Sequence, residues 1–167
     1  MSESRQETVR QVFRCHAAGI AVVTATGDGQ PVGLTVASLT SVCLDPPLLS
    51  FNVRSRSSVW RALSRANRLG VNILTDRQDG VAEFFARSLV QQSAEPAGHL
   101  FTWVDGVPVL GAVTAWLVCE RVDLVTAGDH DIAVCEVIRG RVVSAGPPLV
   151  YHQRRYVSVL PTQAVEA

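Results

Sequence analysis

The alternation of apolar and polar positions predicts a chain of short strands joined by turns. An apolar, β-branched run at residues 20–26 is typical of a strand, and residues 27–30 supply the turn after it. Similar runs predict further strands at residues 31–38, 48–53, 69–74, 109–110, 112–124, 132–145 and 156–159.

Apolar residues at helical spacing predict three short helices, at residues 8–18, 59–66 and 81–88. In the first of these, Val9, Val12 and Phe13 fall on one face, and residues 89–101 are expected to form an irregular loop. Closely spaced strands with a few inserted helices indicate a mainly β fold, an antiparallel barrel with helical decorations. Because no linker or repeat interrupts the chain, we expect a single domain over residues 1–167.

The composition is more apolar than that of an average domain of this size. Of 167 residues, 47% are hydrophobic and 18% charged, and the mean hydropathy is +0.21. Some apolar surface is therefore expected to be buried against a partner chain, most simply in a homodimer. Fifteen basic and fifteen acidic residues cancel, which argues against binding to a nucleic-acid backbone.

Several chemistries are excluded by the residue types. The chain has no lysine, so it offers neither a Schiff-base lysine nor a Walker lysine. Its four cysteines form no C-x-x-C pair, and its histidines show no metal-ligand spacing, so we expect no metal site. The polar N-terminus lacks the apolar stretch of a signal peptide, and no apolar run is long enough for a membrane span. A reducing, cytoplasmic setting is expected.

A stretch of small and hydroxyl residues, residues 33–47, is the most informative part of the chain. Small side chains let a ligand approach the backbone, and hydroxyl groups add hydrogen-bond donors. Asp45-Pro46-Pro47 then ends the segment sharply. An ordinary Ser/Thr-rich strand and turn is the alternative interpretation.

Three further polar segments carry candidate chemistry. Ser55, Arg56, Ser57 and Ser58 precede a predicted helix start, where a phosphate would find N–H, hydroxyl and guanidinium donors; a capped, solvated loop is the alternative. His130 lies between two aspartates that would favour its protonated form, although a surface histidine is the simpler interpretation. Near the C-terminus, residues 151–156 offer aromatic and guanidinium planes, or simply a polar edge strand.

No residue pattern supplies a reaction by itself. The chain has no G-x-S-x-G elbow and no G-x-G-x-x-G after a strand. An enzyme without a nucleophile, metal or lysine would rely on a bound organic cofactor for its chemistry.

Taken together, these segments resemble the flavin reductase family, the FMN-binding split-barrel reductases. The resemblance covers roughly residues 12–159 and is carried by residues 18–24, 33–35, 40–47, 57–60, 70–74, 84–86, 106–110, 119–120 and 128–130, together with Tyr151 and Tyr156. The order of the S-V-x-L-D-P-P and G-D-H elements is its most specific part. Ala37, Leu39, Cys43 and Cys135 depart from the residues that the family usually carries.

The resemblance implies a six-stranded antiparallel Greek-key split barrel and a homodimer. It implies an NAD(P)H:flavin oxidoreductase that passes hydride from nicotinamide C4 to flavin N5 and supplies reduced FMN or FAD to a separate monooxygenase. The resemblance also implies which residues form the site. The flavin ring would contact Thr35, Val36, Ala37 and Ser38, and the ring or ribityl chain would contact Ser41, Val42 and Cys43. The phosphate would be held by Ser55, Arg56, Ser57 and Ser58, the nicotinamide would lie at His130, and the rim of the pocket would include Arg155 and Tyr156.

Two other functions stay open at this point. The departures at Ala37 and Cys43 leave room for a flavin-binding or electron-storage module without turnover, and a purely structural dimeric barrel is the third possibility. The choices between FMN and FAD, and between NADH and NADPH, are also left open by the sequence.

Overall fold

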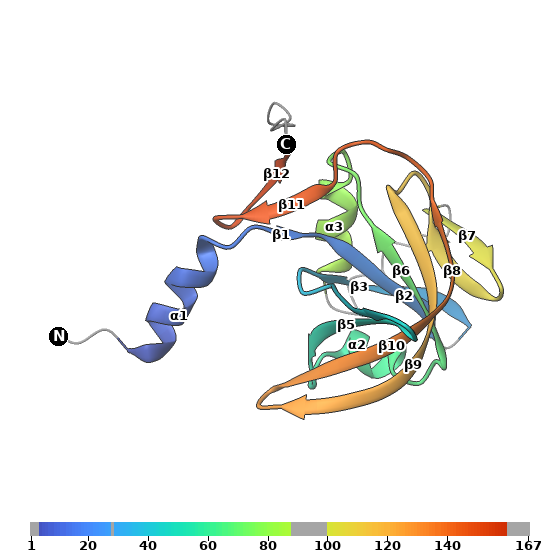
Figure 1. Ribbon diagram of the computed structural model, residues 1–167, viewed down its shortest axis with the longest axis horizontal. Helices are drawn as coiled ribbons and strands as arrows, with labels where there is room; N and C mark the ends of the chain where they lie inside the picture. The colour runs from blue at the N-terminus through green and yellow to red at the C-terminus, as the bar shows by residue number, and fades with distance from the viewer. Residues whose placement is uncertain (1–3, 28, 88–99, 160–167) are drawn as a thin grey trace.

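The computed structural model describes residues 4–27, 29–87 and 100–159, and Figure 1 shows how their elements are arranged. The helices are α1 (Arg5–Arg14), α2 (Ser58–Leu63) and α3 (Asp79–Phe85). The strands are β1 (Ala18–Gly19), β2 (Ala21–Gly27), β3 (Gln30–Val36), β4 (Thr40–Leu44), β5 (Pro47–Arg54), β6 (Arg68–Ile73), β7 (Phe101–Val104), β8 (Val107–Leu110), β9 (Ala115–Ala127), β10 (His130–Val142), β11 (Leu149–His152) and β12 (Arg155–Ser158).

The main sheet is antiparallel and has the strand order β3-β2-β6-β9-β10-β5-β4. The expected mainly β, antiparallel fold is confirmed, but this sheet has seven strands where six were expected. The sequence pattern missed β4 because four of its five residues are exposed, so it shows no apolar alternation. A β1-β11-β12 sheet and a β7-β8 hairpin complete the strands of the described residues.

The first five residues of β2 are buried because the strand is covered on both sides. Ala21 and Val23 pack into a core that α2 caps with Val59, Trp60 and Leu63. The neighbouring positions, such as Val22, pack into a second core with residues of α3. Successive strand residues point to opposite faces, so a strand between two cores has no solvent-facing position in its centre.

The two ends of the main sheet meet beside β5. Ser38, just after β3, accepts a hydrogen bond from the Asn52 N–H at 2.8 Å and donates to the Asn52 carbonyl at 3.2 Å. This contact brings the chain leaving β3 against β5, on the way to β4. A continuous closed barrel stays a prediction, since the strand pairings described form one curved sheet.

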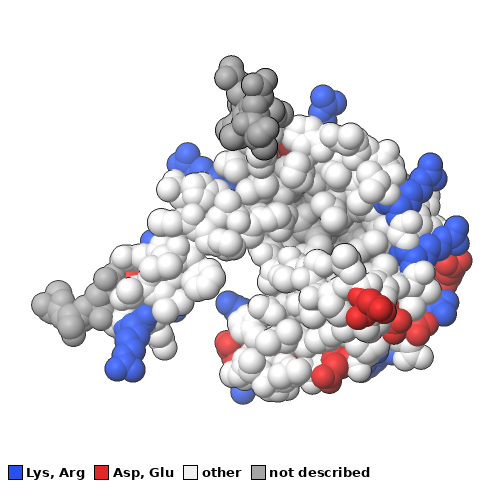
Figure 2. Space-filling view, viewed as in Figure 1, with Lys and Arg blue, Asp and Glu red and all other residues white. Residues whose placement is uncertain are grey.

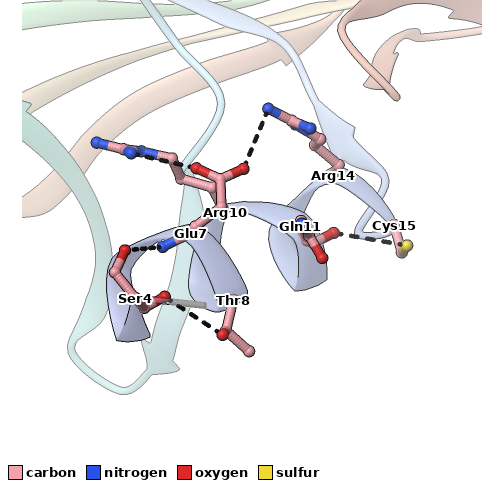
Figure 3. A network of polar contacts seen from close by, with 7 residues as sticks. All are labelled: Ser4, Glu7, Thr8, Arg10, Gln11, Arg14 and Cys15. Carbon is pink, nitrogen blue, oxygen red and sulfur yellow. Dashed lines mark hydrogen bonds and ion pairs between the residues drawn. The ribbon is translucent and has the colours of Figure 1, made fainter. Parts of the chain in front are cut away.

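Helix α1 begins earlier than predicted and buries none of its residues. Ser4 caps it by accepting from the Glu7 N–H at 3.3 Å, and Glu7 pairs with Arg10 and Arg14 at 3.4 and 3.9 Å, as Figure 3 shows. In Figure 1 the helix projects away from the sheets. Its apolar face is therefore left in solvent in the single chain, with Phe13 66% exposed. Among the described residues, no helix has the length and apolarity that crossing a membrane requires.

Candidate functional site

Parts of three of the four polar segments meet near the end of β5 that leads into α2. Strand β5 pairs with β4 on one side and with β10 on the other, and His130 lies opposite Arg54. The N–H of Ser55 donates to the carbonyl of Asp129 at 3.1 Å, which joins the β5–α2 loop to the β9–β10 turn. Ser38 is held against Asn52 on the same strand. The fold thus brings Ser38 near residues 52–58 and 128–131, which lie far apart in the sequence, whereas Ser41 and Cys43 pair with Leu49 and Leu48 toward the other end of β5.

In the first segment, several predicted side chains are used by the fold itself. Thr35 donates its hydroxyl to the Ala82 carbonyl of α3 at 2.7 Å, and Val36 is buried in the core. The Cys43 thiol lies 2.9 Å from the Pro46 carbonyl, inside the tight turn between β4 and β5. Ala37, Ser41 and Val42 are exposed. Contacts from Thr35 or Val36 to a ligand would therefore come from their backbone.

In the β5–α2 loop, some hydrogen-bond donors bind other residues of the protein and others are left available to a ligand. Ser55 donates its hydroxyl to Asp131 at 2.7 Å, so both of its protons are already engaged. Ser57 caps α2 by accepting from the Trp60 N–H at 3.3 Å. Within the described residues, the side chains of Arg56 and Ser58 have no hydrogen-bond partner. These two, with the Ser57 hydroxyl proton, are the donors left for an anion.

His130 starts β10 at the mouth of this region. Its Nδ1 lies 2.7 Å from Oδ1 of Asp129, and its side chain is 41% exposed. The hydrogen bond and charge of His130 hold the pKa of Asp129 below its ordinary value. A carboxylate on Nδ1 orients the ring and leaves Nε2 for a ligand.

Asp131, the residue after His130, is the member of this region that sequence reasoning missed as a site residue. It is only 7% exposed and accepts hydrogen bonds from Ser55, from Nε1 of Trp60 at 3.0 Å and from Thr126 at 3.2 Å. These donors, Ser55 first, lower the pKa of its carboxyl group. A signal was present: Asp131 is in phase with Ala133 and Cys135, both buried on the inner face of β10.

A cavity of about 470 Å³ lies between the loop and the turn. It is lined by Ser55, Arg56, Thr126, Gly128, Asp129 and Asp131. It is thus bounded by the donors of the loop and by the carboxylates of the turn.

The fourth segment lies elsewhere in the single chain. Arg155 and Tyr156 belong to β12, which Figure 1 places at the opposite end of the molecule from the β9–β10 turn. Tyr156 packs beside α3, edge-on to Tyr151 with ring centroids 5.3 Å apart, and burial raises the pKa of its hydroxyl. Their predicted place at the rim of the site stays a prediction.

A second cavity, of about 430 Å³, lies between α1 and the β11–β12 hairpin. It is lined by Arg10, Phe13, Arg14, His16, Tyr151, Gln153 and Arg154.

Figure 2 shows that the face of the molecule around β11, α3 and β3 carries few charged side chains, whereas they gather on the side beyond β6 and β9.

Comparison with known proteins gives one consistent result. Residues 13–160 match the model of the flavin reductase like domain. An NADH:FMN oxidoreductase of Rhodococcus qingshengii is 37% identical over 157 residues, which cover 91% of this chain and 81% of that protein.

Two solved structures share the fold. A flavin reductase domain protein from Arthrobacter sp. FB24 superposes with a TM-score of 0.86 at 30% identity, covering 96% of this chain and 99% of that one. The styrene monooxygenase flavin reductase from Pseudomonas putida S12 has a TM-score of 0.82 at 31% identity, covering 92% and 99%. With the family model spanning most of its length, the chain belongs to the flavin reductase family.

Proposed function

We propose that this protein is an NAD(P)H-dependent flavin reductase that supplies reduced FMN or FAD to a separate monooxygenase. The observation that carries the proposal is the convergence of Ser38, residues 52–58 and residues 128–131 at one end of β5. Family membership and the relative named NADH:FMN oxidoreductase support the same reaction. The naming of a relative as a styrene monooxygenase flavin reductase supports the monooxygenase partner.

The donors at this end of the sheet suit a flavin mononucleotide. The uncommitted side chains of Arg56, Ser57 and Ser58 provide the chemistry that binds a phosphate group. The exposed small residue Ala37, next to Ser38, leaves the backbone accessible near this loop, as the approach of a flat ring requires, and the exposed Ser41 lies further along β4. Val42 and Cys43 extend this surface toward the β4–β5 turn.

The bound flavin would supply the chemistry, its N5 accepting a hydride from C4 of the nicotinamide. The chain itself needs to hold the two rings in contact and exclude water. His130, oriented by Asp129, is placed to hold the nicotinamide carboxamide through Nε2. No general base is needed for hydride transfer, in keeping with a site built from hydroxyl, amide and guanidinium groups.

We also propose that the working form is a homodimer in which α1 contacts the second copy. The helix buries nothing in its own chain, yet Val9, Val12 and Phe13 are 54%, 62% and 66% exposed on one face. An apolar helix face of this kind is stable in water when another surface covers it. The four cysteines are free thiols, in keeping with a cytoplasmic setting.

A steady-state kinetic grid tests the reductase. NADH and NADPH are each varied against FMN and FAD, and nicotinamide absorbance is followed with a flavin-only control. The proposal expects saturable oxidation well above that control, with one pair of substrates preferred. Flavin binding without such oxidation would instead support the electron-storage module.

A further inference from the structure

The carboxylate of Asp131 ties together four separate parts of the chain. Asp131 lies on β10, and its donors come from the β5–α2 loop (Ser55), from α2 (Trp60) and from β9 (Thr126). Oδ1 accepts from both hydroxyl groups, and Oδ2 accepts from the indole of Trp60. The charge is thus balanced by three donors rather than by a cation.

We propose that Asp131 is a positioning residue for flavin binding: it fixes the β5–α2 loop, so that Arg56, Ser57 and Ser58 hold the flavin phosphate while Ser55 only anchors the loop. This inference rests on the proposed function. It assigns Ser55 a different role from its three neighbours, although all four were predicted as phosphate ligands.

The hydrogen bonds of the loop support this division. Ser55 uses its N–H on the Asp129 carbonyl and its hydroxyl proton on Asp131, so it has no proton to give to a phosphate. Trp60, 2% exposed, ties the far end of the loop to the same carboxylate through α2. Between these two anchors lie the residues whose donors are uncommitted. A loop held in place before binding loses less conformational entropy when the ligand arrives.

A carboxylate suits this position better than an amide. A carboxylate is an acceptor only, so it can receive all three donors at once. An asparagine has one acceptor oxygen: it can face the indole of Trp60, with its amide then donating to the two hydroxyl groups, but it carries no charge. Asp131→Asn therefore keeps the shape of the side chain while it removes the charge-assisted hydrogen bonds of the three anchors.

The test compares FMN with riboflavin, which lacks the phosphate. Dissociation constants are measured by flavin fluorescence titration with wild type, Asp131→Asn and the control Asp123→Asn, which removes the same charge from an exposed position on β9. Asp131→Asn is expected to weaken FMN binding by about tenfold, the equivalent of one hydrogen bond to a charged group, and riboflavin binding by less than about twofold. Asp123→Asn is expected to change neither.

A double-mutant cycle separates an anchor from a ligand. If Ser55 acts through Asp131, Ser55→Ala weakens FMN binding in the wild type but adds little in the Asp131→Asn background. Full additivity, or equal weakening of FMN and riboflavin, would overturn the inference. If Asp131→Asn does not fold, as judged by circular dichroism, Thr126→Val removes one donor to the same carboxylate and is expected to shift FMN alone.

The inference and the proposed function fail in different ways. Wild type that binds neither flavin and oxidises no nicotinamide would overturn both. If wild type reduces flavin but binds FMN and riboflavin equally, the proposed reductase function stands. The phosphate site, and with it the proposed role of Asp131, would then be overturned.

Discussion

Nδ1 of His130 and Oδ1 of Asp129 lie 2.7 Å apart at the turn between β9 and β10. The carboxylate holds the imidazole in one orientation. Asp129 also lines the cavity that it shares with Arg56 of the β5–α2 loop.

His130→Ala is expected to lower kcat/KM for the nicotinamide nucleotide by roughly 2- to 10-fold, the loss of one hydrogen bond to the carboxamide. Flavin affinity should stay the same because the phosphate donors lie on another loop. His16→Ala, outside this region, serves as the control. An unchanged kcat/KM would remove His130 from the nicotinamide site.

Replacing Phe13 with aspartate is expected to convert a dimer into monomers. The Phe13 side chain is 66% exposed in its own chain, so the fold itself should be little affected. Multi-angle light scattering after gel filtration gives the mass, with Gln11→Glu as a charge control on the opposite face of α1. A dimer that survives Phe13→Asp would place the interface elsewhere.

Gly33→Ala is expected to destabilise the fold by about 1–3 kcal/mol through overpacking. A Cβ at this position would lie 2.6 Å from Cδ1 of Phe85, the buried ring that joins α3 to β3. Gly80→Ala, on α3 with open space around it, is expected to be neutral or stabilising by up to about 1 kcal/mol. Urea unfolding of the two variants measures the difference, and equal effects would contradict the predicted packing.

Two of the four thiols are expected to react with Ellman's reagent in the folded protein. Burial raises the pKa of Cys119 to about 12 and that of Cys135 to about 11, which leaves almost no thiolate at neutral pH. Cys15 is exposed and Cys43 half-buried. Denaturation should expose Cys119 and Cys135 to the reagent, and Cys15→Ser should reduce the number of reactive thiols in the folded protein to one. Rapid labelling of all four would mean that the core opens readily.

The contribution of Asp131 to folding is expected to disappear in acid. Its pKa is lowered in the folded chain below the ordinary 3.8, mainly by the Ser55 hydroxyl. A lowered carboxyl pKa stabilises the fold above the unfolded value, and this stabilisation is lost as the pH falls through the folded one. The difference in unfolding free energy between wild type and Asp131→Asn should therefore be constant above about pH 5 and shrink below about pH 4. A constant difference down to about pH 2 would contradict the prediction that the folded chain is stabilised by an ionised Asp131.

Much of the fold could be predicted because its signals are local. The β-branched run of β2, the turn after it and the apolar spacing in α2 and α3 each depend on residues close in the chain, and each prediction lies within a few residues of the observed element. The strands β4, β7 and β11 were missed, since short or exposed strands show no clear alternation. Of the loop predicted at 89–101, residues 89–99 lie outside the described part of the chain, and Phe101 begins β7.

The sequence by itself determined which chemistry is available: no lysine, no metal-ligand spacing, and hydroxyl and arginine donors in short segments. Only the tertiary structure decided how those donors are used, because a side chain forms hydrogen bonds with the groups that the fold places next to it. Pairing of β5 with β10 turned Ser55 toward Asp131 and made it an anchor, while Arg56 and Ser58 kept their donors. Contacts between positions 76 residues apart, such as this one, leave no local pattern to read.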